Sequence, residues 1–194
     1  MAVSLSSIPP HRYTLEEYFA LERGSEARYE FWDGEIVCMS GGSLEHSIIS
    51  DNLHVLLSGL VSGKDCRAFS GGMPIRTPAL PPYRYPDASV VCGRMLTEKI
   101  NEIDVLINPV LVVEVLSPGT EQLDREEKRR AYQKLASLKE YLIVSQDAPH
   151  VTQYLRQGRQ WAREDHGDLH ASVELVSIRS QLLIGDIYQG VTFS

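Results

Sequence analysis

The chain has 194 residues, 43% of them hydrophobic, which is enough apolar material for one core in a single domain over residues 1–194. Its formal net charge of -7 argues against broad, non-specific nucleic-acid binding, which needs a basic surface. No segment is apolar over a membrane-spanning length and the first residues do not resemble a secretion signal, so we expect a cytoplasmic protein with no membrane contact. Cys38, Cys66 and Cys92 are far apart and are expected to be buried free thiols.

The N-terminal part of the chain predicts a helix followed by a β-hairpin. Residues 13–24 read YTLEEYFALERG, in which Thr14 and Glu17 have the spacing of a capping box. Asp33-Gly34 then separates two segments with strand composition, which span residues 27–32 and 35–40. An Asp-Gly pair between such segments is a strong signal of a two-residue hairpin turn.

The rest of the chain predicts a mixed sheet flanked by helices. From Ser43 to about Val61 the apolar residues recur every three or four positions, as in an amphipathic helix. A second helix is expected from Thr120 to Ala136 or Ser137, because its first turns are acidic and its last turns basic. The remainder after the last strand is expected to be a polar loop and a short apolar tail. Strands are predicted at residues 66–70, 73–77, 85–92, 109–117, 140–146 and 150–164. This order of elements indicates an α/β sandwich.

Glu114 is a charged residue inside the apolar run PVLVVEVLS. An ionised carboxylate that leaves water is unstable without a partner, so a cation is expected beside it. Asp87 lies in an earlier predicted strand, and the two carboxylates can converge at one end of the sheet. With a backbone carbonyl such as that of Val115, they would form the partly hydrated oxygen site that magnesium prefers.

Five segments of the chain follow the order and spacing of a known family. They are RYEFWDGEIVCMS, the helix around His46, YPDASVV, PVLVVEVLSPGTEQLDREEK and AYQKLASLKEYLIVSQD, and the resemblance they carry extends over nearly the whole chain. In these segments the chain resembles the Uma-type family of restriction endonucleases, within the PD-(D/E)XK phosphodiesterase superfamily. The resemblance implies a restriction-endonuclease-like core, a DNA substrate, a homodimer, and dependence on Mg²⁺, for which Mn²⁺ can substitute.

The resemblance also implies roles for four residues. Asp87 and Glu114 would be the metal-binding carboxylates, and Glu30 an additional acidic residue from an N-terminal element. The commonest pattern has its lysine two residues after the second carboxylate, but that position is Leu116. We therefore expect Lys128 to be a migrated catalytic lysine, because the following helix would place it on one face with Asp124 and Tyr132.

Each role has a structural alternative. Glu114 and Lys128 can form an ion pair with no catalytic function, and Lys128 can also belong to a solvated basic helix end. Asp87 can accept hydrogen bonds at a strand start, and Glu30 can be an exposed cross-strand partner. His46 fits a partly buried structural histidine as well as it fits a site residue. His166 and His170 have the spacing of helical metal ligands, but their surroundings indicate a polar loop. Six arginines flank the proposed site and are either phosphate contacts or solvated surface residues: Arg76, Arg84, Arg94, Arg125, Arg129 and Arg130.

A magnesium-dependent endonuclease that hydrolyses DNA phosphodiester bonds is the main functional hypothesis. Two alternatives remain from other classes. One is a catalytically inactive nucleic-acid-binding or assembly module of the same fold. The other is a hydrolase of a smaller phosphate substrate, which the absence of a Gly-rich phosphate loop in the sequence does not favour.

Overall fold

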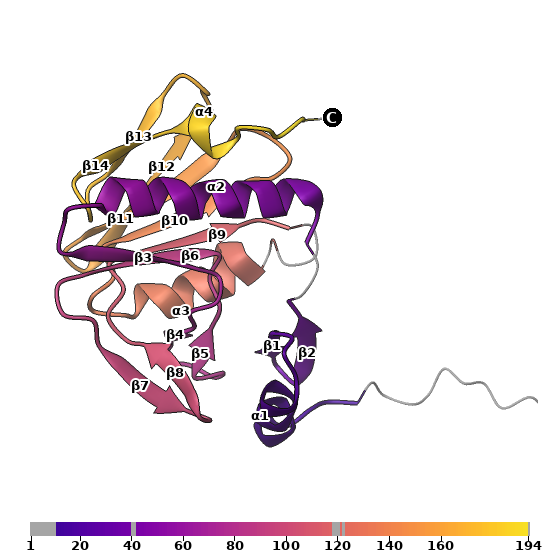
Figure 1. Ribbon diagram of the computed structural model, residues 1–194. Coiled ribbons are helices and arrows are strands. Elements are labelled where there is room, and N and C mark those ends of the chain that lie inside the picture. The colour runs from indigo at the N-terminus through magenta and orange to yellow at the C-terminus, as the bar shows by residue number, and fades with distance from the viewer. Residues whose placement is uncertain (1–10, 40–41, 118–120, 122, 194) are drawn as a thin grey trace, which may run out of the picture. The chain divides into compact units, whose positions relative to one another are not determined.

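The computed structural model describes residues 11–39, 42–117, 121 and 123–193 (Figure 1). The chain divides into two compact units, Met1–Gly41 and Gly42–Ser194. That residues 1–194 form one domain stays a prediction. Within the described residues, no helix is both long enough and apolar enough to cross a membrane.

The N-terminal unit begins with helix α1 (Leu15–Gly24). The Thr14 side chain accepts a hydrogen bond from the backbone N–H of Glu17, and the Glu17 carboxylate accepts one from the Thr14 N–H at 2.7 Å. These two reciprocal bonds satisfy N–H groups that have no partner inside the helix. The predicted capping box and helix are confirmed.

The hairpin follows, with β1 (Tyr29–Trp32) antiparallel to β2 (Glu35–Cys38). Asp33 and Gly34 connect the strands with φ angles of 42° and 87°. Positive φ at both central residues is characteristic of a type I′ turn, whose twist matches that of the strands. The predicted hairpin is confirmed.

A six-stranded mixed sheet forms the centre of the second unit. Its strand order is β12-β11-β10-β9-β6-β3. The β9–β10 pair is parallel and the other pairs are antiparallel, which confirms the prediction of a mixed sheet. The strands are β3 (Cys66–Ser70), β6 (Ala88–Cys92), β9 (Leu111–Val115), β10 (Glu140–Val144), β11 (Val151–Gln157) and β12 (Gln160–His166).

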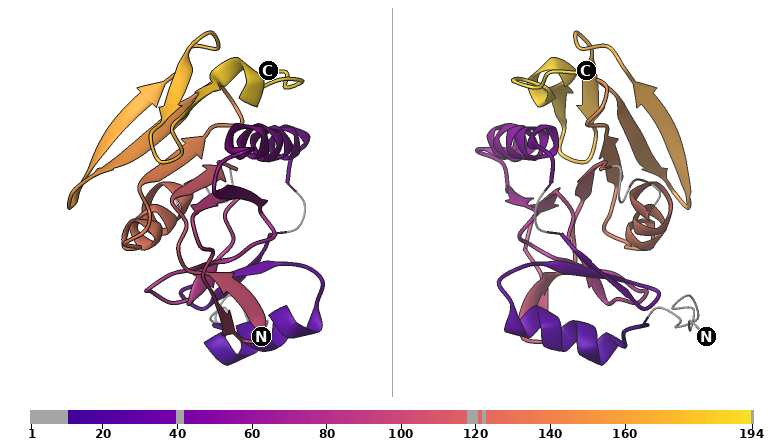
Figure 2. Two further views of the ribbon diagram at one scale, coloured as in Figure 1. Left: turned by 60° about the vertical axis from the view of Figure 1, so that its left-hand side comes forward. Right: turned by 90° about the vertical axis from the view of Figure 1, so that its right-hand side faces the viewer.

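Helices cover both faces of this sheet (Figure 2). Helix α2 (Leu44–Val61) packs its apolar residues on one face, and α3 (Arg129–Gln133) lies on the other. Along β9, Val113 packs in the cluster of α2, while Val112 packs in the cluster that includes Tyr132 of α3. Because β9 is buried on both faces, its residues are apolar on both faces rather than alternating with polar ones, with the single exception of Glu114.

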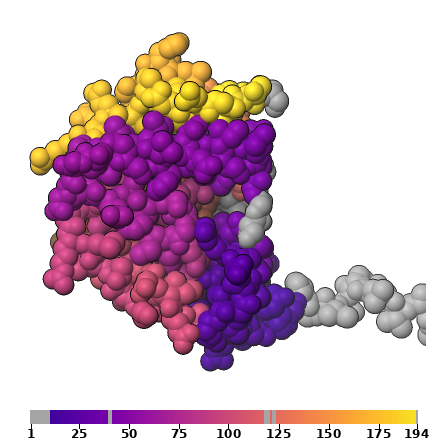
Figure 3. All heavy atoms as spheres, viewed as in Figure 1, coloured from indigo at the N-terminus to yellow at the C-terminus, as the bar shows by residue number. Residues whose placement is uncertain are grey.

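Several short elements were not predicted. The prediction of a polar loop and tail after residue 164 was wrong, because β12 extends to His166 and three further elements follow it. Figure 3 shows the C-terminal residues (yellow) lying along α2, and the Asn52 side chain donates to the carbonyls of Ile187 and Gln189 there. The unpredicted elements are β5 (Tyr83–Arg84), β7 (Thr97–Ile100), β8 (Ile103–Leu106), β13 (Ser172–Leu175), β14 (Ser180–Leu183) and α4 (Ile184–Ile187), and β4 is only Ile75–Arg76.

The cysteine prediction was also wrong. Cys66 and Cys92 are directly opposite each other in the antiparallel register of β3 and β6, and they form a disulfide. Cys38 is free but exposed rather than buried. Cysteines 26 residues apart meet because the intervening segment leaves β3 and returns in β6, a register that sequence spacing does not reveal.

Candidate metal and catalytic site

Asp87 and Glu114 lie at the same end of two neighbouring strands. Asp87 immediately precedes β6, and its N–H donates to the Val113 carbonyl of β9 at 3.1 Å. Its Oδ2 accepts a hydrogen bond from the Val115 N–H at 2.7 Å. Because β6 and β9 are antiparallel, the start of one strand meets the end of the other, where Glu114 is only 1% exposed. The two candidate metal ligands are therefore brought to the same end of two neighbouring strands inside the sheet.

Lys128 forms a buried trio with two carboxylates, Glu114 and Asp124. Its Nζ lies 3.2 Å from Glu114 Oε2 and 3.0 Å from Asp124 Oδ1. Each of the three residues is 1% exposed. Charges removed from water in this way stabilise a fold only when their geometry is good, and removal of one partner leaves a buried charge. The lysine and the second carboxylate chosen from the sequence are therefore in direct contact.

The helix that carries Lys128 differs from the predicted one. Its expected start at Thr120 lies outside the described residues. Residues Leu123–Lys128 form a π-helical segment before α3, which ends at Gln133 rather than at Ala136 or Ser137. Single π-helical turns inside α-helices are often found at functional sites.

A buried tyrosine supports the trio from the next strand. The Tyr141 hydroxyl donates to the Asp124 carbonyl at 3.0 Å, and its ring lies near that of Tyr132. Burial raises the pKa of Tyr141 well above its ordinary value, and the nearby Glu114 and Asp124 carboxylates raise it further. The tyrosine therefore remains a neutral hydrogen-bond donor at neutral pH.

His46 contacts the other carboxylate of the candidate site. Its Nε2 lies 3.5 Å from Asp87 Oδ1, and each of the two side chains is 21% exposed. The hydrogen bond with Asp87 raises the pKa of His46 above its ordinary value in spite of burial, and a hydrogen bond with the Val115 backbone adds to the increase. The sequence left the role of His46 open. A usable signal was present, because His46 continues the stripe of Ile49 and Leu53 and is therefore polar on the buried face of the helix.

The oxygen donors available to a metal are the carboxylates of Asp87 and Glu114 and the Val115 carbonyl. Among the described residues, no three His, Cys, Asp or Glu side chains are grouped closely enough to hold an ion. Magnesium tolerates such a sparse set, since it commonly binds through one or two carboxylates and retains several waters. The donor set therefore fits a partly hydrated Mg²⁺ or Mn²⁺.

Glu30 belongs to the N-terminal unit. It lies on β1 and is 1% exposed, so the alternative of an exposed cross-strand partner is wrong. Its assignment as an additional acidic site residue stays a prediction.

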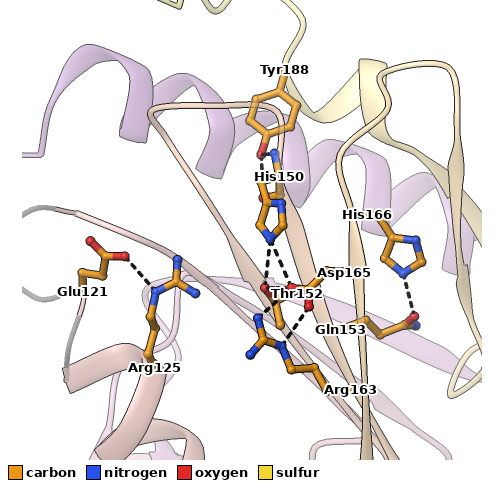
Figure 4. A network of polar contacts seen from close by, with 9 residues as sticks. All are labelled: Glu121, Arg125, His150, Thr152, Gln153, Arg163, Asp165, His166 and Tyr188. Atoms are coloured by element: carbon orange, nitrogen blue, oxygen red, sulfur yellow. Dashed lines mark hydrogen bonds and ion pairs between the residues drawn. The ribbon is translucent and has the colours of Figure 1, made fainter.

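His150 and His166 make polar contacts at strands β11 and β12 (Figure 4). His150 Nε2 lies 3.1 Å from Asp165 Oδ1, and the Arg163 guanidinium lies 2.9 Å from Asp165 Oδ2. The pKa of Asp165 is lowered to about 2, and the largest cause is the hydrogen bond that its carboxylate accepts from Arg163. His166 Nε2 lies 3.3 Å from Gln153 Oε1 at the end of β12, whereas His170 follows in a turn. His166 and His170 therefore do not face each other along a helix, as metal ligands at this spacing would.

Among the candidate phosphate contacts, Arg76, Arg125 and Arg130 each form an ion pair with a carboxylate of the chain. Arg84 is buried, Arg94 is exposed, and Arg129 lies over the Tyr154 ring at 5.0 Å from its centroid. The ion pairs are Arg76–Glu98, Arg125–Glu121 and Arg130–Glu126. Paired arginines have part of their charge compensated, so their contribution to phosphate binding stays a prediction.

Comparison with known proteins identifies the family. Residues 15–182 match the model of the Uma2 family, described as "Putative restriction endonuclease". The protein slr1290 of Synechocystis sp. strain PCC 6803 is 34% identical, with 96% of this chain and 97% of that protein covered. The protein sll1609 of the same strain is 29% identical to this chain, with 83% of this chain and 91% of that protein covered.

A solved structure confirms the fold class. It is the crystal structure of a "putative nuclease belonging to DUF820" from Anabaena variabilis, which superposes with a TM-score of 0.69 at 22% identity. The superposition covers 87% of this chain and 93% of that one. At this level of identity the match is evidence for the restriction-endonuclease-like fold and not for the reaction. The family match, which extends over most of the sequence, shows that this chain belongs to the Uma2 family of "Putative restriction endonuclease" proteins.

Proposed function

We propose that the protein is a Mg²⁺-dependent endonuclease that hydrolyses DNA phosphodiester bonds. The observation that carries this proposal is the position of Asp87 and Glu114 at one end of adjacent strands, with Lys128 Nζ 3.2 Å from Glu114. A nuclease needs anionic oxygens for a metal and a cation for the phosphoryl charge, and both are present here. Membership of the Uma2 family supports nuclease chemistry in general.

In this proposal Asp87, Glu114 and the Val115 carbonyl hold the ion. When bound, a divalent ion supplies a polarised phosphoryl oxygen and an attacking water of lowered pKa. The Val115 N–H fixes Asp87 through Oδ2, which orients the carboxylate before any ligand arrives. Lys128 stabilises the negative charge that develops on the phosphoryl group. Its side chain is only 2% exposed, so the ammonium must leave part of the buried trio to reach a substrate.

Cleavage of supercoiled plasmid in MgCl₂, compared with EDTA, tests the proposal. We expect nicked or linear product only with the metal, and no product from Asp87→Asn. The exposed Asp51 on α2 offers a matched control, because Asp51→Asn removes the same charge away from the strand ends. Failure to cleave single- or double-stranded DNA with either Mg²⁺ or Mn²⁺ would contradict the proposal.

A homodimer is part of this proposal, because one site per strand is the simplest symmetric way to cut a duplex. Sedimentation equilibrium of the purified chain measures the assembly directly. The expected result is a mass near twice the chain mass of 21.8 kDa for the free protein, or the same protein mass plus that of the DNA for the complex. A monomer in both conditions would contradict the assembly but not the chemistry.

A second candidate is a nucleic-acid-binding or assembly module with no activity. The observation that favours it is the buried trio itself, since Lys128 already supplies a cation to Glu114 and Asp124 without any metal. Fluorescence anisotropy with labelled DNA separates the two candidates. Binding of the same strength in EDTA and in Mg²⁺, together with no cleavage, would favour the module.

A further inference from the structure

The contacts of His46 concern the identity of the metal. We infer that His46 is a nitrogen ligand of the bound ion and makes the site selective for Mn²⁺ over Mg²⁺. This inference rests on the proposed function, because it takes Asp87 and Val115 as ligands of the same ion. It assigns a role to a residue that the donor set described above does not include.

The position of the imidazole supports this role. His46 Nε2 lies 3.5 Å from Asp87 Oδ1, and Oδ2 of the same carboxylate accepts a hydrogen bond from the Val115 N–H at 2.7 Å. The imidazole therefore lies beside a carboxylate that is itself held at the strand end proposed for the metal. Two ligand atoms with bonds of about 2.1 Å to one ion lie roughly 3 to 3.5 Å apart. The observed distance of 3.5 Å between His46 Nε2 and Asp87 Oδ1 lies at the upper end of this range.

The surrounding residues hold the imidazole in place. Ser43 caps α2 by accepting from the His46 N–H, and its hydroxyl donates to the Gln146 side chain at 3.0 Å. Gly42 lies so close that a Cβ there would stand 3.1 Å from His46 Nδ1. Backbone, cap and glycine therefore restrict the ring to the side of the helix that faces Asp87. A preorganised ligand loses little conformational entropy when an ion binds.

A nitrogen ligand changes which ion is preferred. Mg²⁺ is a hard cation that favours oxygen ligands and keeps its waters. Imidazole binds first-row transition ions well, and among these Mn²⁺ also accepts carboxylate, carbonyl and water. A site with Asp87, Val115 carbonyl and His46 therefore matches Mn²⁺ more closely than Mg²⁺.

The test measures Mn²⁺ binding to the full chain without any substrate. Loss of the free Mn²⁺ electron paramagnetic resonance signal gives the affinity, and Mg²⁺ competition gives the selectivity. We expect His46→Gln to weaken Mn²⁺ binding by about tenfold or more, which is the usual effect of changing a residue at a metal site, and to weaken Mg²⁺ binding by less. His54→Gln on the same helix is the matched control and should leave both affinities unchanged.

Pulsed electron paramagnetic resonance provides a readout that needs no variant. Wild type loaded with Mn²⁺ should show electron spin-echo modulation from a directly bound nitrogen, and His46→Gln should lose it. Absence of nitrogen modulation in the loaded wild type would overturn the inference, as would an unchanged Mn²⁺ affinity in a folded His46→Gln protein. Asp87→Asn separates this failure from that of the proposed function. If Asp87→Asn weakens binding and His46→Gln does not, only the role of His46 is wrong; if neither weakens it, the ion lies elsewhere.

Discussion

Replacement of Lys128 by methionine tests both the structure and the proposed chemistry. Methionine keeps most of the side-chain volume and removes the ammonium. The buried trio has a formal charge of -1, from Glu114, Asp124 and Lys128, and the variant increases it to -2 with both carboxylates still buried. The folded state should therefore be destabilised through electrostatics rather than through loss of packing.

The expected loss of folding stability in Lys128→Met follows from the two short contacts of the Lys128 ammonium. At 3.0 and 3.2 Å, with an effective dielectric constant of about 20, each attraction is about 5 kcal/mol. The variant also avoids the desolvation of the ammonium, which offsets several kcal/mol, and broken buried pairs lose about 3–5 kcal/mol in practice. For a chain of this length, one kcal/mol lowers Tm by roughly 2–4 °C. Lys128→Met should therefore lower Tm by about 6–20 °C.

Thermal unfolding of the metal-free protein measures this effect. Lys134→Met is the control, because Lys134 is an exposed lysine at the end of the same helix. Addition of Asp124→Asn to Lys128→Met removes one buried negative charge and should recover part of the lost stability. A Tm for Lys128→Met equal to that of Lys134→Met would refute a buried, charged trio.

The same variant then tests catalysis at a temperature where it remains folded. Single-turnover DNA cleavage should fall by about 100-fold or more, while metal affinity stays nearly unchanged or rises slightly, because a cation is removed from beside the ion. Lys128→Arg should rescue poorly, since a planar guanidinium cannot replace a compact ammonium. If folded Lys128→Met cleaves DNA at the wild-type rate, Lys128 is not the catalytic lysine. If only Lys134→Met loses cleavage activity, Lys134 is the catalytic lysine.

Four further predictions follow from the same contacts. Asp87→Ala or Glu114→Ala should abolish divalent-ion binding in calorimetry, because each removes one of two anionic donors; unchanged binding in both would place the ion elsewhere. The logarithm of the DNA cleavage rate should fall with the logarithm of the KCl concentration with only a modest slope, since the chain carries a net charge of -7. A slope that corresponds to many neutralised phosphates would contradict an acidic surface around the site. The pKa of Asp165 is about 2 in the folded protein, against an ordinary 3.8. The ionised carboxylate therefore stabilises the folded state at pH values above 3.8, and this contribution is lost as the pH falls from 3.8 toward 2. Urea unfolding should show that loss in wild type and not in Asp165→Asn. Mass spectrometry after alkylation without reductant should find one modified cysteine, Cys38, and three modified after reduction.

The parts of the fold that were predicted correctly are those with strong local signals. The capping box at Thr14 and the Asp-Gly turn at residue 33 each satisfy backbone hydrogen bonds within a few residues, so no distant contact is needed to form them. Burial of β9 on both faces explains both why its residues other than Glu114 are apolar and why a cation lies beside Glu114. The sequence argument that a buried carboxylate needs a partner was therefore sufficient to expect that contact.

The parts that were missed depend on distant contacts. Strands β7 and β8 are short and partly polar, and β4 supports them by pairing with β8 from a separate part of the chain. Strand β13 has a simple alternation, with Val173 and Leu175 buried, but it is too short to be distinguished from a loop by pattern alone. The disulfide depends on the β3–β6 register, which is a tertiary property.

The geometry also determines what a metal must replace. Asp87 is engaged by His46 from α2, and Glu114 by Lys128 from the helical segment on the opposite face of the sheet. An ion at the common strand end therefore competes with an imidazole at one carboxylate and with an ammonium at the other. If the imidazole stays as a ligand, only the contact with the ammonium has to lengthen, and Asp124 still holds Lys128 at 3.0 Å. Asp124 thus gives the lysine a second anchor, so metal binding need not leave its ammonium buried without a counter-charge.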